Sequence, residues 1–324
     1  MTIAAQKAAR SRIITVGGGK GGVGKSIVAL NLAATLALEG HRVVIADMDL
    51  GAANQHLLLN ISQPGVGLAA LLDKSVSQAK DCLVETQVPN LRLLAGTNGV
   101  LGAANIAHSQ KVLLLRRLRA LEADVIVVDV GAGMGYNALD FFDLGSLKII
   151  VTTPQVTALH DAYAFLKSAA LRLLRHSVEG AIEAALLEPA TLSASTDKVV
   201  KILENLRATR PALADKVFGE IDRFGACMIG NQVIMDAHAG VFGAVAHTMQ
   251  EFLGLKVPVL GWLRSSATIH ESVNNRRPLA MDPASKDAAT FRKLAHAALA
   301  AALPSDERDQ GVVESVTVDE PSAA

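Results

Sequence analysis

Cysteine and aromatic residues are scarce in this chain, and both shortages limit what it can be. Cys82 and Cys227 are its two cysteines, and they form no C-x-x-C pair. We therefore expect reduced thiols rather than a disulfide framework or a zinc site. Aromatic residues make up 3% of the 324 positions, while alanine, leucine and valine dominate a composition that is 50% hydrophobic. Such a composition favours helices packed on a buried parallel sheet.

An excess of charge of one sign and long apolar runs are also missing. The chain has 31 lysine and arginine residues against 31 aspartate and glutamate residues, so no net charge draws it to nucleic acid or a membrane. It has no run of about eighteen apolar residues, so no spanning helix is expected. The first apolar run, residues 13–16, has the length of a strand and not of a signal peptide. We expect a soluble, cytoplasmic protein.

Short aliphatic runs alternate with amphipathic segments along most of the chain. The runs are nearly continuous, as is typical of strands buried on both faces. This order predicts an α/β fold: a doubly wound, mainly parallel sheet of about seven to eight strands with helices on both faces. The expected strands are residues 13–16, 42–46, 91–95, 125–130, 147–152, 226–230 and 257–262, and the clearest expected helices are 26–39, 110–122, 157–176, 236–253 and 284–303.

Two segments depart from this alternation. Residues 177–223 contain helix-like stretches without a convincing strand, of which 197–206 is the clearest, and they predict a helical insertion between two strands. Residues 304–324 contain six acidic residues and one arginine, and we expect this tail to be disordered. The sequence thus predicts one domain over residues 1–303, followed by an acidic tail.

Residues 17–26, GGGKGGVGKS, fit the phosphate-binding pattern G-x-x-x-x-G-K-S between an expected strand and an expected helix. Glycines allow backbone N–H groups to turn toward phosphates, and the following helix adds its positive N-terminus. We expect Lys25 to reach the β- and γ-phosphates of ATP and the Ser26 hydroxyl to ligate Mg²⁺. The alternative is a glycine-rich turn without a ligand. The loop residues expected to bind ATP or ADP are Gly19, Lys20, Gly21, Gly22, Val23, Gly24, Lys25, Ser26 and Ile27.

Acidic residues end two of the expected strands. Asp129 ends the run 125–129 within the expected strand 125–130, and a carboxylate there can hold a water bound to Mg²⁺. The glycine-rich loop after it, which includes Gly133, can sense a γ-phosphate. Asp47 and Asp49 follow the run 42–46, so one can face the metal while the other orients water. The alternatives are a strand-end cap for Asp129 and an ordinary surface turn for the other two.

The loop and three other stretches resemble one known family. Residues 20–26, KGGVGKS, begin with a second lysine, which is the deviant Walker A signature of the MinD/ParA ATPases. Residues 46–54 (ADMDLGAAN), 128–133 (VDVGAG) and 151–156 (VTTPQV) also look like this family. They are nearest to its MinD and flagellar-number (FlhG/FleN) branches. The resemblance covers roughly residues 12–303.

The resemblance implies different roles for the two lysines. Lys25 acts within its own subunit, whereas Lys20 reaches the partner's phosphates across an ATP-bound homodimer. A cation from a second subunit makes dimerisation depend on ATP and stabilises charge during phosphoryl transfer. The expected catalytic residues are Lys20, Lys25, Asp49 and Asp129.

Roles for other polar residues also follow from the resemblance. Asp47 lies near Mg²⁺, Asp49 orients the attacking water, and Asn54 lies near the γ-phosphate. Asn231 matches an adenine-reading asparagine, although a turn at a strand end accounts for it nearly as well. Gln155 departs from the family pattern, in which a glutamate is usual. The expected metal site is Ser26, Asp47 and Asp129.

The function that the resemblance implies is a Mg²⁺-dependent ATPase switch. It would dimerise with ATP, respond to a protein activator or cargo adaptor, and control the position or number of a structure such as flagella or the division site. Three alternatives stay open: a DNA-partitioning ParA, an iron–sulfur carrier of the Mrp/Nbp type, and an amidoligase. DNA binding would need a basic surface, for which residues 111–119 with Lys167, Arg172 and Arg175 are candidates, but a solvated helix face is favoured. The carrier would need a C-terminal C-x-x-C, which the sequence lacks.

The last expected helix bears on membrane binding. Residues 284–303 are rich in alanine, with Phe291, Leu294, Leu299 and Leu303 as a thin apolar stripe suited to packing on the sheet. The acidic tail is repelled by anionic lipid. We therefore expect no autonomous membrane binding, and any location at a membrane or cell pole would depend on a partner.

Overall fold

The structure is a computed structural model that describes residues 11–73, 75–96, 106, 108–177 and 199–302. The expected acidic tail, residues 304–324, lies outside these residues, and so do residues 178–198 of the expected insertion. The described part contains the whole glycine-rich loop and every residue of the expected nucleotide and metal site.

Within these residues, eight strands form a single sheet, which confirms the predicted fold class. Strand β1 is central, between β5 and β6, and all neighbouring strands are parallel except the pair β3 and β4. In sheet order the strands are β3 (Leu83–Glu85), β4 (Leu91–Leu94), β2 (Val43–Met48), β5 (Val125–Val130), β1 (Arg12–Gly17), β6 (Leu147–Thr152), β7 (Ala226–Val233) and β8 (Val259–Arg264).

The observed strands correct the expected ones in several places. Strand β2 continues to Met48, so Asp47 lies within it and not after it. The antiparallel edge strand β3 was not expected, because its three residues are partly exposed and form no apolar run. Strand β8 begins at Val259 rather than at residue 257, since Pro258 has no N–H group to donate to a ladder. Strand β7 continues to Val233, so Asn231 lies within it, at an irregularity of its pairing with β8, and not after it.

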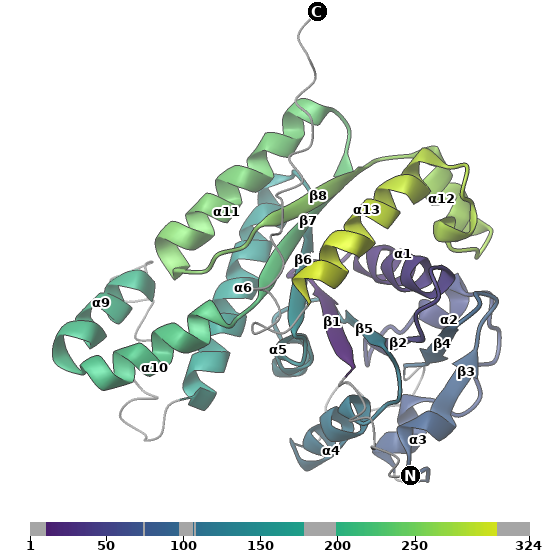
Figure 1. Cartoon of the computed structure of the whole chain (residues 1–324), viewed down its shortest axis with the longest axis horizontal. Coiled ribbons are helices and arrows are strands. Elements are labelled where there is room, and N and C mark those ends of the chain that lie inside the picture. Colours follow the sequence, from purple (N-terminus) through teal and green to yellow (C-terminus); the bar gives the residue numbers. More distant parts are fainter. Residues whose placement is uncertain (1–10, 74, 97–105, 107, 178–198, 303–324) are drawn as a thin grey trace, which may run out of the picture.

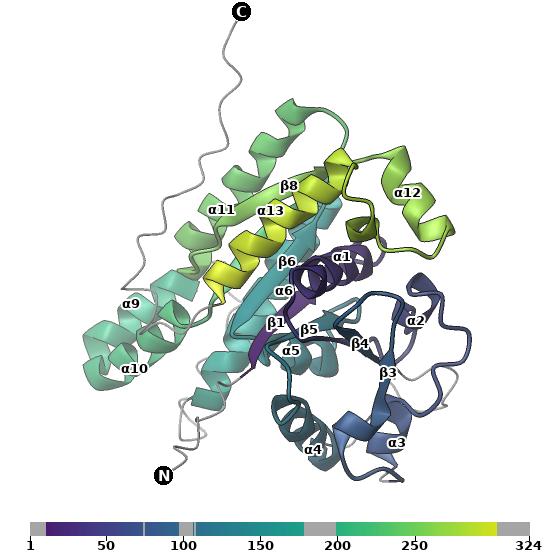
Figure 2. The ribbon, with the colours of Figure 1, turned by 45° about the vertical axis from the view of Figure 1, so that its right-hand side comes forward.

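Helices cover both faces of the sheet, as Figures 1 and 2 show. On one face, buried residues of α1 and α13 pack in a core with strand side chains, and on the other face α4, α5, α6 and α11 do so. The first layer is α1 (Lys25–Leu38), α2 (Gln55–Leu58), α12 (Ala267–Asn274) and α13 (Lys286–Ala301), and the second is α3 (Leu68–Leu72), α4 (His108–Arg119), α5 (Tyr136–Asp143), α6 (Val156–Ser177) and α11 (Gly240–Leu253). None of the helices described combines the length and apolar character needed to cross a bilayer.

A helical extension lies between β6 and β7, as predicted. After α6, helices α9 (Val199–Thr209) and α10 (Pro211–Asp222) pack on each other, and α10 also contacts α6. In both views α9 and α10 lie side by side, away from the edge that carries β3 (Figures 1 and 2). The extension therefore enlarges the helical layer without interrupting the sheet.

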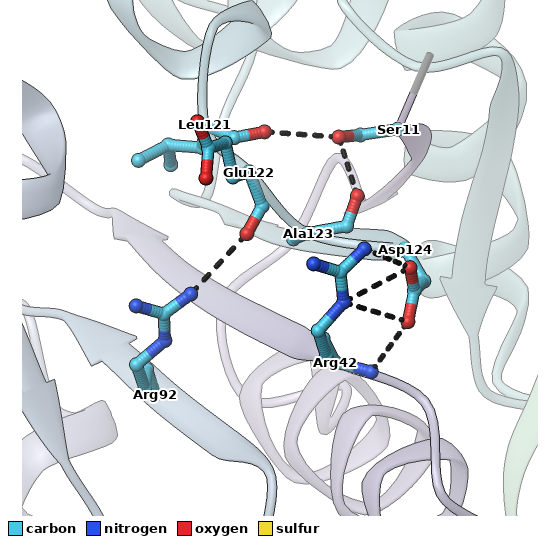
Figure 3. Close-up of polar contacts among 7 residues, drawn as sticks. All are labelled: Ser11, Arg42, Arg92, Leu121, Glu122, Ala123 and Asp124. Carbon is cyan, nitrogen blue, oxygen red and sulfur yellow. Dashed lines mark hydrogen bonds and ion pairs between the residues drawn. The ribbon is translucent and has the colours of Figure 1, made fainter. Parts of the chain in front are cut away.

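The amino ends of the central strands are joined by polar contacts (Figure 3). The guanidinium of Arg42 pairs with Asp124 at 2.6 Å, and the Arg42 backbone N–H donates to the same carboxylate at 2.8 Å. Ser11 donates to the carbonyl oxygens of Leu121 and Ala123 at 3.0 and 2.6 Å. These contacts fix the edge of the sheet opposite to the glycine-rich loop, which leaves the carboxyl edge for the candidate site.

Candidate functional site

The glycine-rich loop connects the central strand β1 to α1 and is shaped by distant segments. A Cβ on Gly19 would overlap the backbone carbonyl of Asp161 in α6. Gly24 has a φ of 93°, and a Cβ there would overlap Asn231 Nδ2. Glycine is required at these two positions because another side chain would collide, and at Gly24 it would also be strained. At Gly21 and Gly22 open space surrounds the position that a Cβ would take, so the loop backbone is accessible there, as phosphate binding requires.

The two lysines of the loop lie in different environments. Lys25 is 8% exposed, and its Nζ donates to the carbonyl oxygen of Lys20 at 3.2 Å. Burial lowers the pKa of Lys25, and the nearby Asp129 and Asp49 oppose this shift. Lys20 is exposed, and its Nζ donates to Thr157 Oγ1 on α6 at 2.9 Å. Lys25 therefore lies inside the site of its own chain, whereas Lys20 lies on the outer surface.

Asp47 and Asp129 form a buried acidic pair at the ends of adjacent strands. They are register partners between β2 and β5, and their exposed fractions are 0% and 1%. Burial raises the pKa of Asp47 to about 6, although N–H groups of Gln55, Asp49 and Asn54 donate to its carboxylate. Burial and then repulsion from Asp47 raise the pKa of Asp129 to about 7. Without a cation, the pair is a site of unfavourable negative charge.

Gln55, which the sequence did not single out, connects this pair to the loop helix. Its Nε2 donates to Asp129 Oδ2 at 2.8 Å and to the carbonyl oxygen of Ser26 at 3.0 Å. Its backbone N–H donates to Asp47 Oδ2 at 2.9 Å. The nearby Ser26 hydroxyl lowers the pKa of the Asp129 carboxyl against the effect of burial. Ser26, Asp47 and Asp129, the three expected metal ligands, are thus brought together.

Unsatisfied atoms test whether these residues fit a cation. In the described part of the chain, two buried side-chain atoms have no hydrogen-bond partner, Gln55 Oε1 and Asp129 Oδ1. A buried group left without a partner costs about 1–3 kcal/mol. Both atoms belong to side chains that are hydrogen-bonded to each other, so both lie at the acidic pair. Carboxylate and amide oxygens are the ligands that Mg²⁺ prefers, and the site fits Mg²⁺.

Asp49 lies between its own turn and the loop after β5. Its Oδ1 accepts hydrogen bonds from the N–H groups of Gly51 and Ala52 at 3.2 and 2.9 Å. A Cβ on Gly131 would come within 3.2 Å of the Asp49 carboxyl carbon, so the two loops are in close contact. Asp49 therefore lies where the loops after β2 and β5 meet, beside the acidic pair.

Asn54 and Gly133 are less closely tied to the pair. The Asn54 backbone N–H donates to Asp47 Oδ2 at 2.9 Å, while its side chain is exposed at the start of α2. Gly133 has a φ of 93°, and open space surrounds the position that its Cβ would take. The structure brings the Asn54 backbone to the site and leaves Gly133 in an open part of the loop.

Asn231 lies under the loop in the structure. Its Nδ2 donates to the carbonyl oxygen of Val23 at 2.8 Å, and its Oδ1 accepts from the N–H of Gln232 at 2.9 Å. Gln232, missed by the sequence analysis, donates through Nε2 to the carbonyl oxygen of Gly22 at 3.0 Å. Both polar groups of the Asn231 side chain are thus bonded to backbone, and contact with an adenine stays a prediction.

A cluster of charged residues lies beyond the β5 loop. Asp140 of α5 is paired with Lys111 of α4 and Arg172 of α6, and their side chains are 10%, 8% and 22% exposed. Burial opposes ionisation of Asp140, but hydrogen bonds from Arg172 and Lys111 hold its pKa below its usual value. Arg117 donates to the carbonyl oxygens of Leu71 and Val76. Lys111, Arg117 and Arg172 therefore hold the fold together. The expected solvated face of residues 111–119 is corrected for Lys111 and Arg117, while Arg116 and Arg119 are exposed as predicted.

A central strand, a glycine-rich loop and carboxylates at the ends of two strands define a P-loop NTPase. A family model described as "ParA: NUBPL iron-transfer P-loop NTPase" matches residues 9–184 of the chain. The chain belongs to this ParA/MinD family of P-loop NTPases, as the sequence predicted.

Relatives within the family include proteins of flagella and cell division. "Flagellum site-determining protein YlxH" of Helicobacter pylori is 34% identical over 159 residues, which are 48% of this chain and 53% of that protein. "Antiactivator FleN" of Pseudomonas aeruginosa is 33% identical over 158 residues, 48% and 55% of the two chains. The chain thus spans about half the length of the curated relatives it matches.

A solved structure shares the fold over most of the chain. The septum site-determining protein MinD of Pyrococcus horikoshii, complexed with Mg-ADP, superposes with a TM-score of 0.61 at 22% identity. The match covers 88% of this chain and 94% of that one. At this identity the likeness establishes the fold.

Proposed function

We propose that the chain is a Mg²⁺-dependent ATPase that forms a homodimer with ATP and dissociates after hydrolysis. The single observation that carries this proposal is the separation of the two loop lysines. Lys25 is buried beside Asp129, whereas Lys20 is exposed and reaches outward to Thr157. A cation on the outer surface of a phosphate-binding loop is placed to act on a nucleotide in a second subunit.

Exposed apolar side chains at the carboxyl edge of the sheet support the dimer. Met134, Tyr136, Val156, Ile234 and Met235 follow strands β5, β6 and β7 and are 49%, 70%, 82%, 74% and 56% exposed. Apolar side chains that gather around a site favour contact with another protein surface. A second copy seated on this edge would cover these side chains and bring its Lys20 toward the nucleotide.

Different residues of the site would bind the nucleotide, hold the metal and orient the attacking water. The loop backbone and Lys25 would bind the phosphates of ATP, and Asn231 would face the adenine. Ser26, Asp47 and Asp129 would hold Mg²⁺, which neutralises phosphate charge when bound. Asp49 would orient the attacking water, and Asn54 and Gly133 would lie near the γ-phosphate. The carboxylates with these roles are the buried acidic pair, Asp47 and Asp129, and Asp49 in the turn beside it.

Three substitutions test the proposal. Lys25→Ala removes a buried charge from the phosphates, which should weaken ADP binding by at least about tenfold, measured by calorimetry. Lys20→Ala should bind ADP like wild type and stay monomeric with ATP, measured by light scattering. Asp49→Ala should remain a dimer with ATP because hydrolysis lacks its positioning carboxylate. Normal ATP-dependent dimerisation by Lys20→Ala would refute the role of Lys20 across the interface.

The biological output of this switch is inferred from the relatives. Proteins named for flagellum site determination and for antiactivation match about half of this chain, so we propose that the dimer controls the position or number of flagella or of the division site. An activator or cargo adaptor would recognise the ATP-bound dimer. A pull-down with the Asp49→Ala protein in ATP, compared with ADP, tests this output, and recovery of the same proteins in both states would contradict it.

A further inference from the structure

Gln55 is a neutral amide that is buried without exposed surface between two parts of the candidate site. Through Nε2 it contacts Ser26 and Asp129, and through its backbone N–H it contacts Asp47. One residue therefore touches the loop helix and both members of the acidic pair. The residues proposed above to hold the metal and to orient the attacking water do not include Gln55.

The orientation of the amide is set by its neighbours. The carbonyl oxygen of Ser26 and Asp129 Oδ2 are both acceptors, so the NH₂ group faces them. The Gln55 Oε1 is then directed away from these two atoms. It is buried and without a partner among the described residues, and so is Asp129 Oδ1. The two hydrogen-bonded side chains thus present two free acceptor oxygens within the same site.

We propose that Gln55 positions the Mg²⁺ of the nucleotide site, with its Oε1 and Asp129 Oδ1 accepting hydrogen bonds from water held by the cation. This inference rests on the proposed function, since it requires a Mg²⁺–nucleotide complex. Mg²⁺ keeps several of its waters when it binds a protein, and a cation's water is a strong donor. Residues that contact such waters orient the ligands of the metal and contribute to its affinity. Gln55 is therefore a positioning residue, and its effect is on the affinity for the cation.

The test uses the full chain with ADP and with Mn²⁺ as a paramagnetic substitute for Mg²⁺. Electron paramagnetic resonance of free Mn²⁺ gives the affinity of the ADP-bound protein for the cation, and calorimetry in EDTA gives the affinity for ADP alone. Gln55→Leu should weaken Mn²⁺ binding about tenfold and leave ADP binding in EDTA within about twofold of wild type. Equal Mn²⁺ affinity of wild type and Gln55→Leu would overturn the proposal, as would a loss of ADP affinity in EDTA of the same size as the Mn²⁺ effect.

Gln87→Leu is a matched control. The Gln87 amide also donates to two backbone carbonyl oxygens, of Leu59 and Arg276, but it does not contact the acidic pair. This variant should bind ADP and Mn²⁺ like wild type. A loss of Mn²⁺ affinity equal to that of Gln55→Leu would show a general effect of removing an amide and would refute the assignment.

Gln55→Glu tests the acceptor oxygen of this side chain separately from its NH₂ donor. A carboxylate keeps an acceptor oxygen but cannot donate to Ser26 or Asp129. If Gln55→Glu binds Mn²⁺ as tightly as wild type or more tightly, the proposal is supported. This result counts even if Gln55→Leu fails to fold. An equal loss in Gln55→Glu and Gln55→Leu would show that only the donor matters, which overturns it. A wild-type chain that does not bind ADP would instead refute the proposed function, and this inference with it.

Discussion

Replacing Gly24 with alanine tests how the nucleotide loop is held in place. Gly24 has a φ of 93°, and its added Cβ would overlap Asn231 Nδ2, which donates to the carbonyl oxygen of Val23. The left-handed conformation costs alanine about 1–2 kcal/mol. Displacing the amide loses a hydrogen bond worth about 1 kcal/mol. Gly24→Ala should therefore lower the free energy of unfolding by about 2–3 kcal/mol.

Two neighbouring glycines supply the controls for this measurement. Gly22 has a φ of 80°, and open space surrounds the position of its Cβ. Gly22→Ala should therefore lower the free energy of unfolding by the cost of the left-handed conformation alone, about 1–2 kcal/mol. Gly21 lies in open space without a left-handed φ, and Gly21→Ala should change stability by less than about 0.5 kcal/mol. Urea unfolding followed by circular dichroism gives all three values, without nucleotide because a ligand adds its own stabilisation.

The collision itself is measured by a double-mutant cycle. In an Asn231→Ala background the overlap is absent, so Gly24→Ala should there destabilise by the same amount as Gly22→Ala does in the wild type. If the effects of Gly24→Ala and Asn231→Ala are additive, the amide does not limit the position of the loop and our reasoning is wrong.

Two further predictions concern the buried charges. Asp140→Ala leaves Lys111 and Arg172 without their shared carboxylate and should lower the free energy of unfolding by about 3–5 kcal/mol in urea; a change below about 1 kcal/mol would contradict the pairing. The pKa of Asp129 is raised on folding, so its ionisation destabilises the metal-free protein above pH 7 and not below pH 4. Asp129→Asn in EDTA should thus raise the thermal midpoint at pH 8, with a gain that shrinks toward pH 4, and a gain independent of pH would refute this reasoning.

Much of the fold could be predicted because parallel strands buried on both faces leave a local signal. The apolar run 125–130, for example, corresponds residue for residue to β5. Strand β3 has no such signal, because its three partly exposed residues owe their conformation to pairing with β4. The shift of β8 is caused by Pro258, and the extension of β7 to Val233 involves polar residues that a search for apolar runs passes over.

The residues of the site that could be predicted are those that stand in a short continuous sequence motif. Lys25 and Ser26 are adjacent in one glycine-rich motif at the start of α1, and Asp129 ends an apolar run, so their placement follows from the local sequence pattern. Gln55 bonds to Asp129 across 74 positions, and in the sequence it is one polar residue in a polar turn. The burial that gives it a role arises when α2 closes over the ends of β2 and β5, which no local pattern shows.

The distance along the chain between the loop and its supports has a consequence for synthesis. Val23 and Gly22 are held by Asn231 and Gln232, 208 and 210 positions later. At about 5–20 residues per second, a ribosome makes these supports roughly 10–40 s after the loop. A nascent polypeptide that ends before β7 therefore has the complete GGGKGGVGKS sequence without the contacts that give it its shape. The loop therefore acquires its shape only after β7 has been made, more than 200 residues after the loop itself.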